Sequence, residues 1–281
     1  MPVIAMTREM GSLGKDVATG LARDLGLKLV YHEIVDSLAH KLHLGESEVL
    51  RLIQGNAGLV ERWRTNLDAL SLYTAEEVFA LGAAGNVIIR GWGATHLLRA
   101  VSHVLCIRVC APFELRVRRI MERLSLDDFD LAATEVRRND AAHAAAMLRR
   151  FHIDWQEAER YDLVLNTEQV TVEHCIAQIK RLLELPQFQP AAVSRARLEQ
   201  LALSAHVLAA LKLDPVTSGV RISVEPSMNG SEGCVKLSGI VLDEDQKRSV
   251  EAVASRLPGV RAVENQLRTM RPRHGPISFD G

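Results

Sequence analysis

The stretch VIAMTREMGSLGKDVATGLARDLGL, residues 3–27, passes from a branched apolar run directly into an amphipathic pattern. Two glycines and a lysine stand at the transition, at Gly11, Gly14 and Lys15. This pattern predicts a buried strand, a tight turn and a helix, the arrangement in which backbone N–H groups at a helix N-terminus can hold a phosphate. The stretch therefore predicts an α/β fold with a phosphate-binding loop at residues 8–16.

The predicted loop matches the common phosphate-loop pattern G-x-x-x-x-G-K-[ST] only in part. Gly14 and Lys15 fit the pattern, whereas Glu9 occupies its first glycine position and Asp16 its hydroxyl position. The carboxylate of Asp16 could bind Mg²⁺ directly or repel phosphate, and the motif does not decide between the two. On this half-match alone, a glycine-containing turn without a ligand remains an equal alternative.

Composition limits the possible partners. The 281 residues suffice for two domains, and a formal net charge of −1 provides no basic field for nucleic acid or an anionic membrane. No run approaches the roughly 18 apolar residues of a membrane-spanning helix, and no signal peptide opens the chain. The four cysteines lack metal-ligand spacing. We expect a cytoplasmic protein with reduced thiols, no nucleic-acid partner and no integral membrane segment.

Four apolar runs rich in branched residues predict the strands of a parallel sheet covered by helices on both faces. The runs are residues 3–6, 86–90, 103–110 and 161–166. Helical periodicity separates them over residues 16–25, 45–82, 113–124, 131–150 and 172–184.

Two prolines in LPQFQPAAVS, residues 185–194, interrupt this alternation and predict a domain boundary. The pattern beyond them is helix, strand, strand, helix, strand, which indicates a small αββαβ module of the α+β class. We predict a first domain, a linker, a second domain and a tail over residues 1–187, 188–194, 195–270 and 271–281.

Four stretches of the first domain resemble the cytidylate-kinase-like family of nucleoside monophosphate kinases, in the family's order. They are TREMGSLGKDVATGLARDLGL, VIIRGWGATHLL, LCIRVCAPFELRVRRIMER and FHIDWQEAERYDLVLNTEQVTVEHCIAQI. The loop in that family resembles S/T-R-x-x-G-S-x-G-x, so Glu9 is not a defect there. The resemblance implies a P-loop α/β/α sandwich that uses ATP and Mg²⁺ to phosphorylate a CMP or dCMP acceptor.

The resemblance also implies a set of site residues. The donor phosphates and Mg²⁺ would be held by Gly11, Ser12, Leu13, Gly14, Lys15, Asp16 and Arg119, with Asp16 as the metal ligand. The acceptor nucleotide would be held by Arg8, His32, Arg90 and Asp140. Lys15, Arg90 and Arg138 would act in phosphoryl transfer, because spreading charge over the transferring oxygens is the main task of such a site.

Several positions depart from the family pattern. Asn139 and His143 stand where arginines of the lid are expected, Ile89 replaces a glycine, and His32 replaces an aspartate. Four nearby arginines are possible substitutes for the lid arginines, namely Arg137, Arg138, Arg149 and Arg150. Two functions therefore remain open, an active kinase and a nucleotide-binding pseudokinase that acts as a sensor or scaffold; an empty loop in a structural protein is a third.

The second domain resembles a BON domain. The segments VKLSG, at residues 235–239, and GVRAVEN, at residues 259–265, carry this resemblance. No nucleophile, carboxylate pair or metal cluster stands out in it. We expect a binding or regulatory module with a protein partner or with self-association, beside a first domain whose partners are nucleotides.

Overall fold

The computed structural model describes the chain except for His32 and residues 55–66, 227–232 and 271–281. The acceptor contact predicted for His32 and the predicted tail therefore lie outside the described residues. The chain divides into two compact units, Met1–Ala202 and Leu203–Gly281, and each is described by itself.

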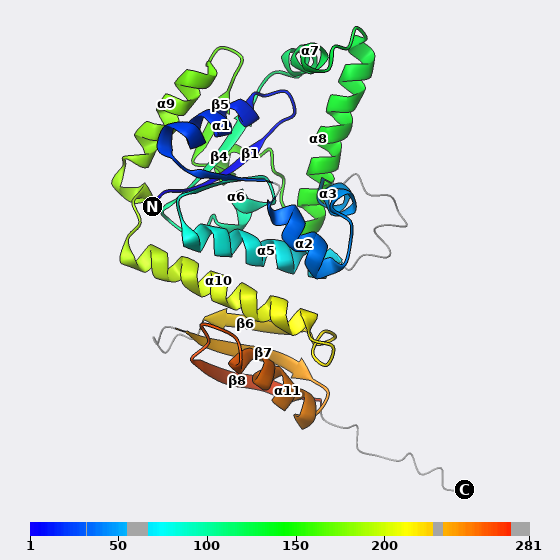
Figure 1. The fold of residues 1–281 in the computed structure, drawn as a ribbon, viewed down its shortest axis with the longest axis vertical. Helices are drawn as coiled ribbons and strands as arrows, with labels where there is room; N and C mark the ends of the chain where they lie inside the picture. The colour runs from blue at the N-terminus through cyan, green and yellow to red at the C-terminus, as the bar shows by residue number, and fades with distance from the viewer. Residues whose placement is uncertain (32, 55–66, 227–232, 271–281) are drawn as a thin grey trace, which may run out of the picture. The chain divides into compact units, whose positions relative to one another are not determined.

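The first unit is built on a five-stranded parallel sheet of order β2-β3-β1-β4-β5 (Figure 1). The strands are β1 (Val3–Arg8), β2 (Lys28–Val30), β3 (Val87–Arg90), β4 (Val104–Cys110) and β5 (Leu163–Asn166). The four predicted apolar runs form β1, β3, β4 and β5, and the short strand β2 is added at one edge. The parallel sheet with helices on both faces confirms the predicted α/β fold.

Helices cover both faces of this sheet. They are α1 (Gly14–Leu25), α2 (Glu33–Leu42), α3 (Glu46–Gln54), α5 (Leu67–Ala84), α6 (Ala94–Leu97), α7 (Phe113–Leu124), α8 (Phe129–Phe151) and α9 (Val172–Leu183). Helices α1 and α9 pack on one face, where Leu21 and Ile179 are fully buried against Ile4 and Met6 of β1. Helices α5 and α6 lie on the opposite face (Figure 1). Of the helices in the described ranges, none has the length and apolarity needed to cross a membrane.

The long helix α8 has defined ends. The side chain of Asp128 accepts a hydrogen bond of 3.0 Å from the backbone N–H of Leu131, which is an N-cap. His152 ends the helix in the left-handed conformation, with φ 56°. The 23 residues between these ends form one unbroken helix, so side chains seven residues apart lie on the same face.

The second unit is a three-stranded sheet with helices, in the predicted order αββαβ. Its elements are the part of α10 (Ala192–Leu213) that follows Ala202, and then β6 (Ile222–Pro226), β7 (Cys234–Val241), α11 (Glu244–Ser255) and β8 (Ala262–Thr269). Strand β7 pairs antiparallel with β6 and parallel with β8. The core of this unit includes Val207 of α10, Leu237 of β7 and Val250 of α11, all fully buried. Because α10 begins at Ala192, the predicted linker 188–194 contains its first turn.

Candidate functional site

The loop between β1 and α1 requires its two glycines. Gly11 has a φ of +80°, and a Cβ atom there would lie 2.6 Å from the backbone carbonyl oxygen of Arg116. Leu13 is also left-handed, with φ 58°. A Cβ atom on Gly14 would lie 2.6 Å from the Cβ atom of Arg8. A positive φ and close packing therefore explain the glycines that the sequence places in this loop.

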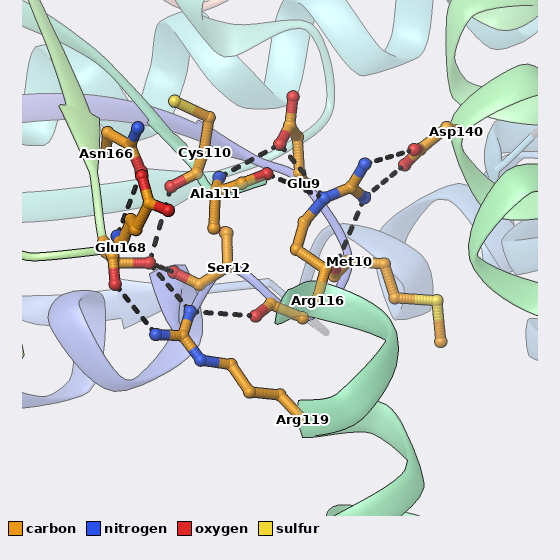
Figure 2. Close-up of polar contacts among 12 residues, drawn as sticks. Glu9, Met10, Ser12, Cys110, Ala111, Arg116, Arg119, Asp140, Asn166 and Glu168 are labelled. Atoms are coloured by element: carbon orange, nitrogen blue, oxygen red, sulfur yellow. Dashed lines mark hydrogen bonds and ion pairs between the residues drawn. The ribbon is translucent and has the colours of Figure 1, made fainter. Parts of the chain in front are cut away.

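Side chains outside the loop hold its carbonyl oxygens (Figure 2). The hydrogen bonds are from Arg116 Nη1 to Met10 O at 3.2 Å, from Arg119 Nη1 to Gly11 O at 3.4 Å and from Thr167 Oγ1 to Ser12 O at 2.9 Å. The N–H of a trans peptide points away from its C=O. The N–H groups of Gly11 and Leu13 therefore point away from Arg116 and Thr167.

The N–H groups of this region that have no hydrogen-bond partner among the described residues include those of Gly11, Leu13, Gly14 and Lys15. We call these four the loop amides. They lie in the loop and at the N-terminus of α1, where the helix dipole also favours negative charge. Free N–H groups beside such an N-terminus fit an anion such as a phosphate.

The carboxylate of Glu9 anchors the start of the loop. Glu9 is buried and accepts hydrogen bonds from Arg108 Nη2 at 2.6 Å and from the backbone N–H of Ala111 at 3.2 Å. Its second oxygen lies 3.3 Å from Arg116 Nε. Two guanidinium groups thus compensate one buried carboxylate, which explains why glutamate is compatible with this loop.

Lys15 and Asp16 lie in the first turn of α1, and both side chains are exposed. The ammonium group of Lys15 therefore remains available to an anion at the loop. In the described part of the chain, no three His, Cys, Asp or Glu side chains come together as a metal site. A Mg²⁺ ion held here could take Asp16 as a carboxylate ligand and further oxygens from water and phosphate, a coordination that suits this ion.

A cleft opens at the carboxyl ends of β1 and β3, the edge where parallel sheets bind ligands. Thr7 and Arg8 of β1 and Arg90 of β3 line it, together with Tyr31, which follows β2. The cleft has about 850 Å³ of space free of protein atoms, a volume that includes space open to solvent. Since Thr7 and Arg8 directly precede the loop, the cleft adjoins it. We call it the pocket.

One face of α8 forms a wall of the pocket. Its lining residues are Asn139, Asp140, His143, Ala146, Met147 and Arg150. Their spacing of one, three, three, one and three residues follows the helical repeat, so they share one face. Arg150 donates a hydrogen bond of 3.0 Å to Thr74 Oγ1, which ties the end of this face to α5.

Three arginines make the pocket electropositive. Burial, and next the charge of Arg90, lower the pKa of Arg8 below its ordinary value. Burial likewise lowers the pKa of Arg90, whose guanidinium lies 4.2 Å from the centre of the Tyr31 ring. Burial lowers the pKa of Arg150 to about 10. All three remain cations at neutral pH, and their crowding favours an anionic ligand.

His143 is neutral in this environment. Burial, followed by the charges of Arg8, Arg108 and Arg150, lowers its pKa to about 4. Its ring meets the Trp155 indole edge-on, with 4.4 Å between the ring centres. At neutral pH the position therefore supplies a neutral imidazole, where the family pattern suggests a cationic arginine.

Four buried nitrogen atoms of the pocket have no hydrogen-bond partner within the described ranges. They are Arg90 Nε, Trp92 Nε1, His143 Nε2 and Trp155 Nε1. Buried polar groups in native proteins nearly always pair with protein groups or ordered water, so these nitrogens are candidates for pairing with water or with a bound ligand. We call these atoms the open nitrogens.

The structure brings together some of the predicted site residues and separates others. Arg8, Arg90 and Asp140, predicted to bind the acceptor, line one pocket. Arg119, predicted beside the donor phosphates, holds the loop and Thr167 through its guanidinium. The side chain of Arg138 is 67% exposed, pairs with Glu135 at 3.9 Å and is not among the residues that line the pocket.

Sequence reasoning missed the aromatic residues of the pocket. Tyr31, Trp92 and Trp155 line it, and each comes from a different segment. The sequence held two signals for them: Trp92 comes shortly after a predicted strand, and Trp155 ends the stretch FHIDW, which carries the family resemblance. Arg150 was one of four candidate lid arginines, and among these four it alone lines the pocket; Arg137, for example, lies over the Phe113 ring.

A parallel sheet with a glycine-containing loop after its first strand, beside an arginine-lined pocket, has the architecture of the P-loop kinases. Residues 3–169 match the family model described as the cytidylate kinase-like family, and the chain belongs to that family. The cytidylate kinase of Pyrobaculum islandicum is 29% identical over 177 residues, which span 63% of this chain and 89% of that protein. The cytidylate kinase of Staphylothermus marinus is 28% identical over 100 residues, 36% of this chain and 55% of that protein.

Two further findings concern the fold. A crystal structure of an uncharacterized protein from Eubacterium ventriosum superposes with a TM-score of 0.52 and 17% identity, covering 66% of this chain and 99% of that one. Residues 201–270 match the model of the BON domain, in agreement with the small mixed sheet of the second unit.

Proposed function

We propose that this protein is a nucleoside monophosphate kinase, which transfers a phosphoryl group from ATP to an acceptor of the CMP or dCMP type. One observation carries the proposal: the unpaired loop amides directly adjoin a pocket lined by three arginines. A phosphoryl-transfer site needs a donor cradle and an acceptor site side by side, each rich in positive charge. The two cytidylate kinases similar to this chain support the choice of acceptor.

Each part of the site then has a role. The loop amides and Lys15 bind the donor phosphates, and Lys15 stabilises the charge on the transferring oxygens. A Mg²⁺ ion, when bound, would neutralise phosphate charge, and Asp16 would be its carboxylate ligand. Arg8 and Arg90 bind the acceptor phosphate, since planar guanidinium groups contact phosphate oxygens in pairs. The aromatic rings of the pocket provide flat surfaces for a base.

We assign the lid arginine to Arg150 in place of Arg138. Arg150 reaches the pocket from the same face of α8 as His143, two helical turns later. The exposed side chain of Arg138 would have to move to reach the same space.

The pseudokinase alternative has its own supporting observation. The family's lid pattern favours an arginine at position 143, and here a neutral histidine with a pKa of about 4 stands there. One missing arginine can lower the rate of phosphoryl transfer by roughly three to five orders of magnitude. In that case the first unit would bind nucleotide without turnover and act as a sensor or scaffold through the second unit.

A coupled assay of ADP release tests these alternatives. CMP, dCMP, UMP, AMP and GMP would each be supplied with ATP and Mg²⁺, and the Lys15→Ala variant compared with the full wild-type chain. We expect turnover with a cytidine monophosphate, reduced by about 10²–10³-fold in Lys15→Ala. Lys28→Gln, which changes an exposed lysine of β2, is the matched control and should retain full activity.

Two other results have a clear meaning. A thermal shift with ATP but no turnover with any monophosphate supports the pseudokinase. No thermal shift with any nucleotide contradicts both functions.

A further inference from the structure

One side chain contacts both the loop and the pocket wall. Arg116, on α7, donates from Nη1 to the carbonyl oxygen of Met10 in the loop at 3.2 Å. The same guanidinium binds the carboxylate of Asp140 on α8 through two hydrogen bonds, Nη1 to Oδ1 at 3.1 Å and Nη2 to Oδ2 at 2.9 Å (Figure 2). A single rigid group thus spans two parts of the site that come from distant segments of the chain.

The surroundings fix the orientation of this guanidinium. Its Nε donates to the carbonyl oxygen of Ala111 at 3.1 Å and lies 3.3 Å from Glu9 Oε2. The side chain of Arg116 is only 7% exposed, so water does not compete for these contacts. A planar fork with every nitrogen engaged cannot turn toward one partner without weakening its bond to another.

Asp140 transmits this constraint to the pocket. It lies on the pocket-facing side of α8, three residues before His143 and ten before Arg150. Because α8 is one unbroken helix, a shift at Asp140 changes the positions of His143 and Arg150 as well.

We propose that the Arg116–Asp140 pair couples donor binding at the loop to acceptor binding in the pocket. This inference rests on the proposed nucleotide sites. A phosphate bound by the loop amides stabilises the loop conformation described above, which presents Met10 O and Glu9 to Arg116. The guanidinium is then held in the orientation that fits Asp140, and the wall of the pocket is ordered before the acceptor arrives. Binding of one ligand therefore reduces the entropic cost of ordering the site when the other ligand binds. By linkage the effect is the same in both directions.

Calorimetric titrations of the full-length protein test the coupling. The Kd for CMP would be measured with and without a non-hydrolysable ATP analogue and Mg²⁺, and the Kd for the analogue with and without CMP. Trp92 and Trp155 line the pocket, so tryptophan fluorescence gives a second readout. In the wild type we expect each ligand to tighten the other by the same factor, about 5-fold or more.

Two variants break the link in different ways. Asp140→Asn keeps the shape of the side chain but removes its charge, and Arg116→Lys keeps a charge but removes the fork. In both we expect the coupling factor to fall to about 1, whatever happens to the separate affinities. Glu135→Gln is the matched control, because Glu135 is a carboxylate of the same helix paired with an arginine on its exposed side. It should retain the wild-type factor.

The possible outcomes separate this inference from the proposed function. If neither ligand binds the wild type, the proposed function fails and the coupling with it. If both ligands bind and the wild-type factor is 1, or persists in folded Asp140→Asn, the coupling alone is overturned. If Asp140→Asn raises the Kd for CMP by the same factor with and without the analogue, Asp140 acts only as a direct ligand of CMP. That result also overturns the coupling. Should Arg116→Lys not fold, Asp140→Asn decides alone, since its amide oxygen still accepts one hydrogen bond from Arg116.

Discussion

The loop and the pocket leave opposite kinds of polar group unpaired. Around the loop, the side chains of Glu9, Arg116 and Arg119 bind other protein groups, and the free groups are backbone amides. In the pocket, the backbone lies largely in regular strands and a helix, and the free groups are the side-chain open nitrogens. The loop would therefore recognise an anion through its conformation, and the pocket would recognise its ligand through side-chain identity.

This difference predicts where mutations act. Side chains around the loop are structural, so replacing them should lower stability first and binding as a consequence. The open nitrogens themselves contribute little to the folded state without a ligand, whereas the rings of Trp92 and Trp155 are almost fully buried, so a change that removes only the nitrogen should mainly lower affinity. Functional sites commonly hold groups that stability alone would not select.

The largest effect is expected for Glu9→Ala. The change leaves the guanidinium groups of Arg108 and Arg116 buried without their shared carboxylate. Removing one partner of a buried ion pair lowers the free energy of unfolding by about 3–5 kcal/mol. Urea unfolding followed by tryptophan fluorescence measures this, since Trp92 and Trp155 lie in the first unit. The neutral Glu9→Gln, which keeps hydrogen-bond capacity, should lose less; equal stability of Glu9→Ala and wild type would contradict the structural role.

The second prediction concerns Arg90, whose replacement should lower affinity for the acceptor nucleotide and not stability, the opposite of the result expected for Glu9. Arg90 is buried and makes no hydrogen bond to the described residues, and burial lowers its pKa. Arg90→Met should therefore change the free energy of unfolding little, because removing a buried guanidinium without a hydrogen-bond partner among the described residues offsets the loss of its contact with the Tyr31 ring. Its affinity for the acceptor nucleotide should fall by roughly 10–100-fold, the effect of losing charge-assisted hydrogen bonds. A titration with CMP beside urea unfolding separates the two effects, and a clear loss of stability with unchanged affinity would contradict the comparison.

The fold was predictable because its signals are local. Strands β1, β3 and β4 are continuous buried runs of apolar residues, and a parallel sheet follows from such runs alternating with helices. Strand β2 gives no such signal, because it has three residues and Lys28 among them is exposed. The loop was equally readable, since Gly11 and Gly14 occupy positions that exclude a side chain.

The pocket was less predictable because it is assembled from distant segments. Arg8 and Arg90 end predicted strands and could be placed at one edge of the sheet. Trp92 and Trp155 could not, since only the tertiary fold brings them to the same cavity. The role of Arg150 depends on which face of α8 lines the pocket. Once His143 was known to face the pocket, the helical repeat would have placed Arg150, seven residues later, on the same face.

The third prediction concerns pH and His143. Its pKa is about 4 in the folded state and about 6.5 in an unfolded chain, so the unfolded state binds more protons between these values. Stability is therefore lost as the pH falls from 6.5 toward 4. Compared with His143→Gln, the wild type should lose roughly 2 kcal/mol more between pH 7 and pH 4.5. Urea unfolding of both proteins at the two pH values measures the difference, and parallel losses would show that His143 titrates normally.

The smallest effect distinguishes two neighbouring aromatic groups. Trp155 Nε1 is one of the open nitrogens, whereas the hydroxyl of Tyr161 donates a hydrogen bond of 2.6 Å to the backbone oxygen of Trp155. Trp155→Phe removes this donor together with part of a ring that is 1% exposed, so it should lower the free energy of unfolding through lost packing and also lower the affinity for CMP, by about 3–10-fold for one neutral hydrogen bond. Tyr161→Phe removes a bond that the protein already makes, so it should lower the free energy of unfolding by about 1 kcal/mol and leave the affinity unchanged. If both variants weakened CMP binding equally, packing around Trp155, and not its free N–H, would determine affinity, and the distinction between satisfied and open groups would not hold in this pocket.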